Sequence, residues 1–149
     1  MSCHITYPGH AYFEAYLEVR YRVLRAPLGL PLGSERDASD GLETTRHLVW
    51  VEGEAALGCV QLQARPEPGW AQVRFMAVAP EAQDQGIGAA LMAYLEQLAA
   101  EEGYAHLTLN ARENALGFYT RLGYTRHEEI APYYGIRHWR MTKPLAENL

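Results

Sequence analysis

The chain has little lysine and no cluster of positive charge. Lys143 is the only lysine among 149 residues, against twelve arginines, and the formal net charge at pH 7 is −5. Binding to a nucleic-acid backbone depends on clustered positive charge. The nearest approach to such a cluster is Arg20, Arg22 and Arg25. We therefore expect no nucleic-acid partner.

Long apolar runs and cysteines are also scarce. No apolar stretch approaches the about 20 residues that a membrane-spanning helix needs, and the first ten residues lack the basic segment and apolar core of a secretory signal. Cys3 and Cys59 have no metal-ligand spacing, and a disulfide framework needs more than one possible pair. These absences predict no membrane partner, no metal site and a cytoplasmic protein.

The remaining composition, 48% hydrophobic and 21% charged, predicts one globular domain over 1–149. Apolar residues at three- and four-residue spacing indicate helices, and alternating ones indicate strands. In chain order the sequence predicts a helix at 11–25, strands at 47–52, 57–64 and 70–78, a helix at 86–102, a strand at 106–109, a helix at 114–122 and strands at 124–127 and 138–143. This order predicts an α/β fold with a single central mixed sheet flanked by helices.

The third predicted strand has a regular alternation. Over 70–78 it would place Val73, Phe75 and Ala77 on one face and Arg74 and Met76 on the other. The three consecutive strands with short connections imply a meander.

The segment Gln83-Asp84-Gln85-Gly86-Ile87-Gly88 follows this strand and opens a helix. Unpaired amides and the positive end of the helix dipole make such a junction a phosphate site. The two glycines serve close helix–strand packing equally well. A Walker loop is excluded because Gly-Lys-Ser/Thr is absent, and the dinucleotide fingerprint is excluded because Leu91 stands where its third glycine belongs.

Two segments of the chain resemble the GNAT acetyltransferase superfamily. Gln83, Gly86 and Gly88 match its Gln/Arg-x-x-Gly-x-Gly/Ala signature between a strand and a helix. Residues 114–124 resemble its A-x-x-F-Y-x-x-L-G-F segment almost position for position. The resemblance covers roughly position 49 to the last strand, and the front of the chain is similar to a subgroup whose members often lack an assigned substrate.

The resemblance implies the GNAT fold, in which the third strand bulges and splays from the next and acetyl-CoA lies in the wedge as cosubstrate. Backbone groups of the strand would pair with the pantetheine arm, and amides of 83–89 would hold the pyrophosphate. Arg112 stands where the family often has asparagine, and we expect it to face a cofactor phosphate. The implied cofactor-binding residues are Met76, Ala77, Val78, Gln83, Asp84, Gln85, Gly86, Ile87, Gly88, Ala89, Arg112, Phe118 and Tyr119.

The catalytic candidates are Tyr119, Glu35 and His138. The phenol of Tyr119 would return a proton to the departing thiolate, and Glu35 or His138 would take the proton of the amine. Asp37 and His47 are further candidates for this base. The carboxylates fit solvated loop charges or a helix cap equally well, and a lone strand histidine such as His138 is more often structural.

The resemblance implies an N-acetyltransferase that acts on a primary amine by direct attack in a ternary complex. A small-molecule acceptor is favoured over a protein. The alternative is a catalytically silent acetyl-CoA-binding module. A homodimer built on exposed strands or on the aromatic residues near the C-terminus would not be surprising.

Overall fold

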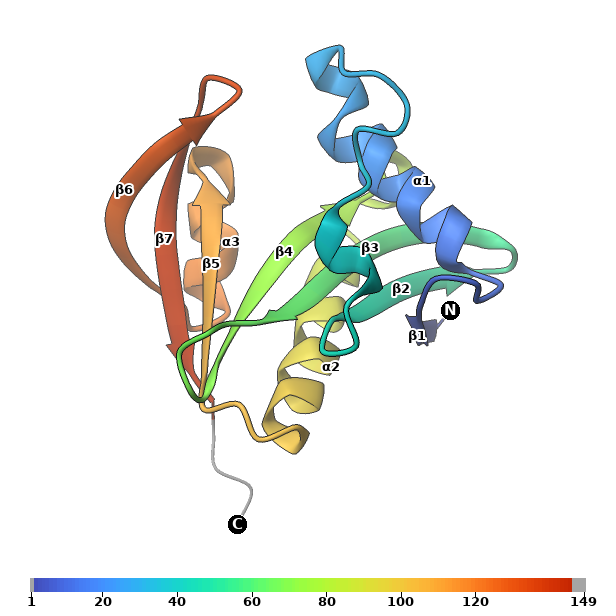
Figure 1. Cartoon of the computed structure of the whole chain (residues 1–149). Helices are drawn as coiled ribbons and strands as arrows, with labels where there is room; N and C mark the ends of the chain where they lie inside the picture. Colours follow the sequence, from blue (N-terminus) through green and yellow to red (C-terminus); the bar gives the residue numbers. More distant parts are fainter. Residues whose placement is uncertain (1, 146–149) are drawn as a thin grey trace.

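The computed structural model describes residues 2–145, which form a seven-stranded mixed sheet in the order β1-β2-β3-β4-β5-β7-β6 (Figure 1). The predicted α/β fold with one central mixed sheet flanked by helices is confirmed. In chain order the elements are β1 (Ser2–Thr6), α1 (Phe13–Leu24), β2 (Arg46–Glu52), β3 (Ala55–Ala64), β4 (Trp70–Val78), α2 (Ile87–Glu101), β5 (His106–Arg112), α3 (Leu116–Arg121), β6 (Thr125–Tyr133) and β7 (Ile136–Pro144). The predicted meander is the antiparallel run β2-β3-β4.

The sheet carries a hydrophobic core on each face. Helix α1 covers one face through Phe13, Tyr16 and Leu17, which pack with residues of β2 and β3. Helices α2 and α3 cover the other face, where Leu91, Leu95 and other apolar side chains form the larger cluster (Figure 1). The amphipathic stripes read from the sequence are therefore the faces that the two long helices bury.

The sequence prediction missed strand β1 and the second half of β6. Both strands lie at the edges of the sheet. In β1 only Thr6 is buried, and in β6 no residue is buried. Neither strand therefore has the apolar alternation that marks a half-buried strand.

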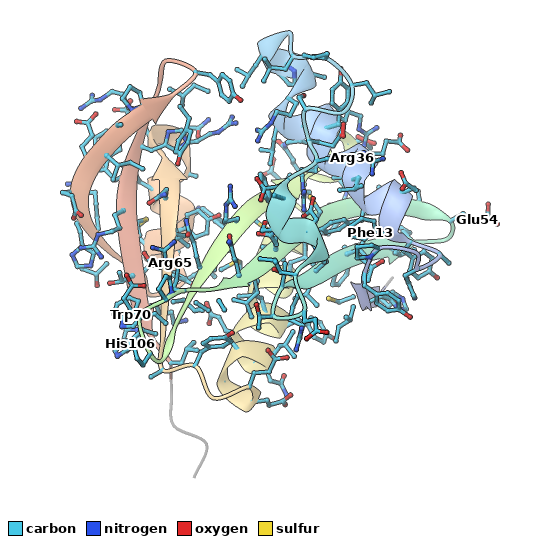
Figure 2. The ribbon with its side chains drawn as sticks, viewed as in Figure 1. Phe13, Arg36, Glu54, Arg65, Trp70 and His106 are labelled. Atoms are coloured by element: carbon cyan, nitrogen blue, oxygen red, sulfur yellow. The ribbon has the colours of Figure 1, made fainter. Side chains whose placement is uncertain are left out.

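Strands β4 and β5 are joined only at one end. Their parallel pairing is limited to Trp70–His106, Ala71–Leu107 and Gln72–Thr108. Beyond these pairs the strands diverge (Figure 1). At the closed end Trp70 stacks on His106, with 4.6 Å between ring centroids and 19° between planes (Figure 2). The expected splayed strands are thus present.

A bulge interrupts β4 on its way to the open end. Gln61 pairs with Arg74, whereas Cys59 pairs with Ala77, so β4 contains one extra residue. Phe75, at the bulge, has a positive φ of 55°, a strained conformation for a residue other than glycine. The predicted strict alternation of 70–78 is therefore wrong: Val73 packs in the α2-side core, and Ala77 packs in the α1-side core.

Among residues 2–145, no helix combines the length and the apolar character required to cross a membrane.

Candidate functional site

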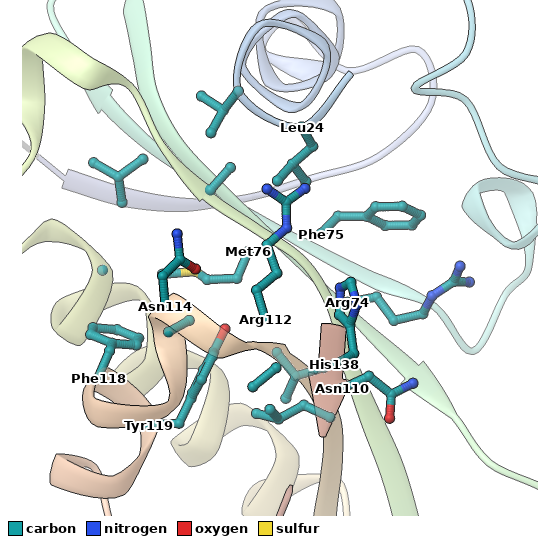
Figure 3. Close-up of a pocket in the computed structure, with 18 of the residues that line it drawn as sticks. Leu24, Arg74, Phe75, Met76, Asn110, Arg112, Asn114, Phe118, Tyr119 and His138 are labelled. Atoms are coloured by element: carbon teal, nitrogen blue, oxygen red, sulfur yellow. The ribbon is translucent and has the colours of Figure 1, made fainter. Parts of the chain in front are cut away.

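The gap between β4 and β5 contains a cavity of about 700 Å³ (Figure 3). The bulge, the start of α2, the end of β5 and helix α3 form its walls. Of the residues expected at the site, the following line it: Met76, Ala77, Val78, Gln83, Asp84, Gly86, Ile87, Gly88, Arg112, Phe118, Tyr119 and His138. Segments far apart in the sequence are thus brought together around one space.

The wall at the start of α2 presents unpaired backbone amides. Asp84 and Gly86 both have positive φ, 62° and 79°, and turn the chain into the helix. The helix has no side-chain N-cap, and its first backbone hydrogen bond runs from Ala90 N–H to Gly86 O. The amides of 87–89 precede that bond, so this turn has the donors and the dipole orientation of an anion site.

Gly88 lies where any larger residue would crowd its neighbours. A Cβ at this position would lie 3.2 Å from Met76 Cε and 3.2 Å from Phe118 Cζ. The absent side chain leaves the amides of the first turn open to the cavity. Close packing is thus observed at Gly88, and the same missing side chain is compatible with the predicted phosphate site.

The inner edge of β4 offers main-chain groups to the gap. Ala79 N–H donates to Leu57 O of β3 at 2.8 Å, and neighbouring residues of a strand direct their polar groups to opposite sides. Val78 therefore directs its N–H and C=O away from β3, toward the gap. Gln83 Nε2 donates to Val78 O at 3.3 Å and ties this edge to the turn.

Tyr119 supplies a phenol to the cavity from α3. Its ring packs edge-on against Phe118 and Tyr124, and only 7% of the residue is exposed. Figure 3 shows its hydroxyl pointing into the cavity, toward Asn114 and Arg112. The hydroxyl has no hydrogen-bond partner among residues 2–145, and burial raises its pKa well above the ordinary value. The group is a protonated acid at neutral pH.

His138 reaches the same cavity from β7 and is 6% exposed. Its Nδ1 lies 2.7 Å from Ile136 O. A carbonyl oxygen only accepts, so Nδ1 carries the proton and the lone pair of the neutral ring is on Nε2. Nε2 has no hydrogen-bond partner in the described part of the chain. This tautomer is the one that a general base requires.

Glu35 and Asp37 do not line the cavity. Buried Glu35 accepts the Gly33 N–H at 2.8 Å, and Asp37 caps the short helical turn at Ala38–Gly41 and pairs with Arg74 at 3.3 Å. Asp37 therefore has the capping role that the sequence left open, whereas Glu35 is buried and is not the solvated loop charge considered there. Gln85 and Ala89, expected at the cofactor, also fall outside the lining residues.

Sequence reasoning missed the charge of the cavity. Four arginines line it, namely Arg25, Arg74, Arg112 and Arg121, whereas Asp84 is its only carboxylate within the described chain. Burial and the nearby charge of Arg25 lower the pKa of Arg112. The arginines lie far apart in the sequence, so no spacing marks them as a group.

Residues 35–145 match the family described as Acetyltransferase (GNAT) domain, and the chain therefore belongs to the GNAT acetyltransferase family. The uncharacterized N-acetyltransferase YjcF of Bacillus subtilis is 29% identical over 126 residues, which cover 84% of this chain and 87% of YjcF.

Solved structures share the fold. An acyl-CoA N-acyltransferase from Pseudomonas aeruginosa has a TM-score of 0.82 at 22% identity, over 95% of this chain and 98% of that one. An aminoglycoside 6'-N-acetyltransferase complexed with coenzyme A has a TM-score of 0.83 at 14% identity, over 100% of this chain and 99% of the other.

Proposed function

We propose that the protein is a cytoplasmic N-acetyltransferase that moves an acetyl group from acetyl-CoA to a primary amine by direct attack in a ternary complex. The observation that carries this proposal is the cavity between β4 and β5, which has an anion-binding turn on one wall and the free phenol of Tyr119 on another. Family membership supports it, as does the coenzyme A bound to the similar aminoglycoside enzyme.

The residues at the open edge fit acetyl-CoA. The amides of 87–89 would hold the pyrophosphate at the helix terminus, where Gly88 leaves room for it. The carbonyl of Val78, which already accepts from Gln83 Nε2 and has a second lone pair, would accept from the pantetheine arm, while Met76 and Phe118 would contact its apolar part. Arg121 of α3 lines the same cavity and suits a phosphate of the coenzyme.

The chemistry follows from three groups. The N–H of Val78 would donate to the thioester oxygen, where negative charge builds in the transition state. As the new C–N bond forms, the C–S bond breaks and the thiolate takes a proton from Tyr119. His138 Nε2 would accept the proton of the amine, directly or through one water. An alkyl amine of pKa ~10.4 is neutral only about once in 2,500 molecules at pH 7, so the base matters.

Direct transfer is favoured over a covalent acyl-enzyme. The described lining of the cavity contains no cysteine, serine, threonine or lysine. Cys59 is fully buried, and burial raises the pKa of its thiol to about 12, so it carries no thiolate at neutral pH. The amine itself is then the nucleophile.

The test measures free thiol released from acetyl-CoA by the purified protein, with and without a panel of primary amines. Mass spectrometry identifies the acetylated product. We expect release that depends on the amine. Tight binding of acetyl-CoA by calorimetry without turnover on any amine would instead identify a catalytically silent binding module.

A further inference from the structure

Two arginines that line the cavity, Arg25 and Arg112, have no counter-charge among residues 2–145. Arg25 directly follows α1, and among residues 2–145 its guanidinium donates only to backbone oxygens, Ser34 O at 3.2 Å and Leu24 O at 3.2 Å. Arg112 ends β5, and its guanidinium makes no hydrogen bond within residues 2–145. In that same range neither guanidinium has a carboxylate within 4.0 Å.

Of the other two arginines in the cavity, Arg74 has a carboxylate partner, whereas Arg121 at the end of α3 has none among residues 2–145. Arg74 pairs with Asp37, Nη1 to Oδ2, at 3.3 Å. The one carboxylate among the described lining residues, Asp84, lies in the turn before α2. Burial and the like charge of Arg25 lower the pKa of Arg112. Two unbalanced, half-buried cations at close quarters are costly, and an anion placed between them removes the cost.

The pair lies on the acceptor side of the cavity. Figure 3 shows the guanidinium of Arg112 reaching toward Leu24 of α1, while Phe118, beside Gly88 and the coenzyme turn, lies across the cavity. Arg25 Cζ lies 5.8 Å from the ring centroid of Tyr134, at the β6–β7 turn, and 5.7 Å from that of Phe75. An anionic group bound here would therefore be part of the acceptor amine. We do not assign Arg112 to a cofactor phosphate, the role expected from the sequence.

We propose that Arg25 and Arg112 bind a carboxylate of the acceptor, so that the substrate is an amine that also carries an acid group, as an amino acid does. This inference rests on the proposed acetyl transfer. The planar fork of arginine matches a carboxylate, and Phe75, Tyr133 and Tyr134 offer an aromatic wall to an apolar side chain. Polycationic acceptors such as aminoglycosides or polyamines would meet like charge here.

Matched acceptors test the acid group. Phenylalanine is compared with phenethylamine, which has the same amine and ring without the carboxylate, and spermidine serves as a polycation. We expect kcat/KM for phenylalanine to exceed that for phenethylamine by about tenfold or more, the worth of a charge-assisted hydrogen bond. Equal or higher kcat/KM for phenethylamine or spermidine would overturn the inference while acetyl transfer stands.

Variants test the two arginines. Arg25→Gln and Arg112→Gln should each raise KM for phenylalanine about tenfold and leave KM for acetyl-CoA unchanged. Arg126→Gln removes the same charge from the exposed strand β6 and should change neither. A rise in KM for acetyl-CoA instead would assign the pair to the coenzyme and overturn the inference.

A binding measurement separates this inference from the proposed function. If no amine is acetylated, the proposed acetyl transfer is wrong. Calorimetry with N-acetylphenylalanine in the presence of coenzyme A then tests the carboxylate site independently of turnover. N-acetylphenylalanine should bind more tightly than N-acetylphenethylamine, and the advantage should be lost in both arginine variants. Equal affinities of the two compounds for the unsubstituted protein would overturn the site.

Discussion

The guanidinium of Arg20 lies over the ring of Phe75, with Cζ 4.1 Å from the ring centroid. Arg20 is fully buried on α1 and donates through Nη1 to both carboxylate oxygens of Asp40, at 3.1 and 2.9 Å, and through Nη2 to Tyr16 Oη at 2.8 Å. One buried cation thus links α1, the 38–41 turn and the bulge at the edge of the cavity.

Arg20→Met should destabilise the protein by about 3–5 kcal/mol, because it leaves the Asp40 carboxylate buried without its partner. The matched control is Arg22→Met on the same helix. Arg22 pairs with Glu81 at 2.7 Å, but both side chains are about half exposed, at 42% and 54%. This change should cost less than about 1 kcal/mol. Urea unfolding measures both, and equal losses would contradict the role of the buried network.

Tyr119→Phe should lower kcat by about 100-fold or more, the usual worth of a positioned acid. The dissociation constant of acetyl-CoA should stay nearly the same, because the ring packing against Phe118 and Tyr124 is kept. Steady-state kinetics and calorimetry measure the two quantities. Unchanged turnover in the variant would remove the general-acid role.

His138→Gln should also lower kcat by about 100-fold or more, since glutamine offers no basic lone pair. The ring leans edge-on against Tyr133 at 5.1 Å, so a merely structural role predicts lost stability instead. Added imidazole should restore part of the activity of His138→Ala if the base is what was lost. Full activity at unchanged stability in His138→Gln would exclude it as the base.

Gly88→Ala should raise the dissociation constant of acetyl-CoA about tenfold, or about 1.4 kcal/mol. The added methyl would crowd Met76 and Phe118 at 3.2 Å and stand before the open amides. Folding stability should change by no more than about 1 kcal/mol, because alanine favours the helix. Ala93→Gly on the exposed face of α2 serves as control and should leave affinity unchanged.

Stability should fall as the pH drops below 6.5, because burial lowers the pKa of His47 from 6.5. Between its folded and unfolded pKa values the unfolded chain binds more protons, so acid favours unfolding. Nε2 lies 3.0 Å from Asp40 O and Nδ1 lies 2.8 Å from Tyr16 Oη, so the neutral ring fits this network. NMR titration of the histidines checks the pKa; an ordinary value would contradict this.

The elements of the fold with a buried face could be predicted from the sequence. Helix α2 and strands β2, β3 and β4 have apolar periodicity because one side of each packs on a core. Strands β1 and β6 are edges whose side chains are largely exposed, so the residue pattern marked only the start of β6 and none of β1. A bulge in this strand was expected from the family resemblance for β4, but its position at Phe75 was not, because it follows from strand register and not from residue type.

The residues of the candidate site also differ in how far the sequence could predict them. The turn at 83–88 was chosen as a contiguous motif with a local physical reason, and Tyr119 was chosen through the family resemblance; the structure places both at the cavity. Glu35 was chosen for its loop, yet the structure buries it against Gly33, away from the cavity. Arg25 and Arg112 lie 87 positions apart in the sequence and come to one cavity only in the folded chain, so no local sequence pattern predicts that they act together.

The short paired region between β4 and β5 lies at the end of the strands opposite the cavity opening. Within the sheet, three residue pairs and the Trp70–His106 stack join β4 to β5 at one end, and a shared core under α2 and α3 joins the two halves below it. Val78 and Arg112 are the last residues of β4 and β5, so the angle at which the two strands leave this end determines how far apart they lie. Residues at the paired end, such as Trp70 and His106, therefore help to set the width of the opening without touching a ligand.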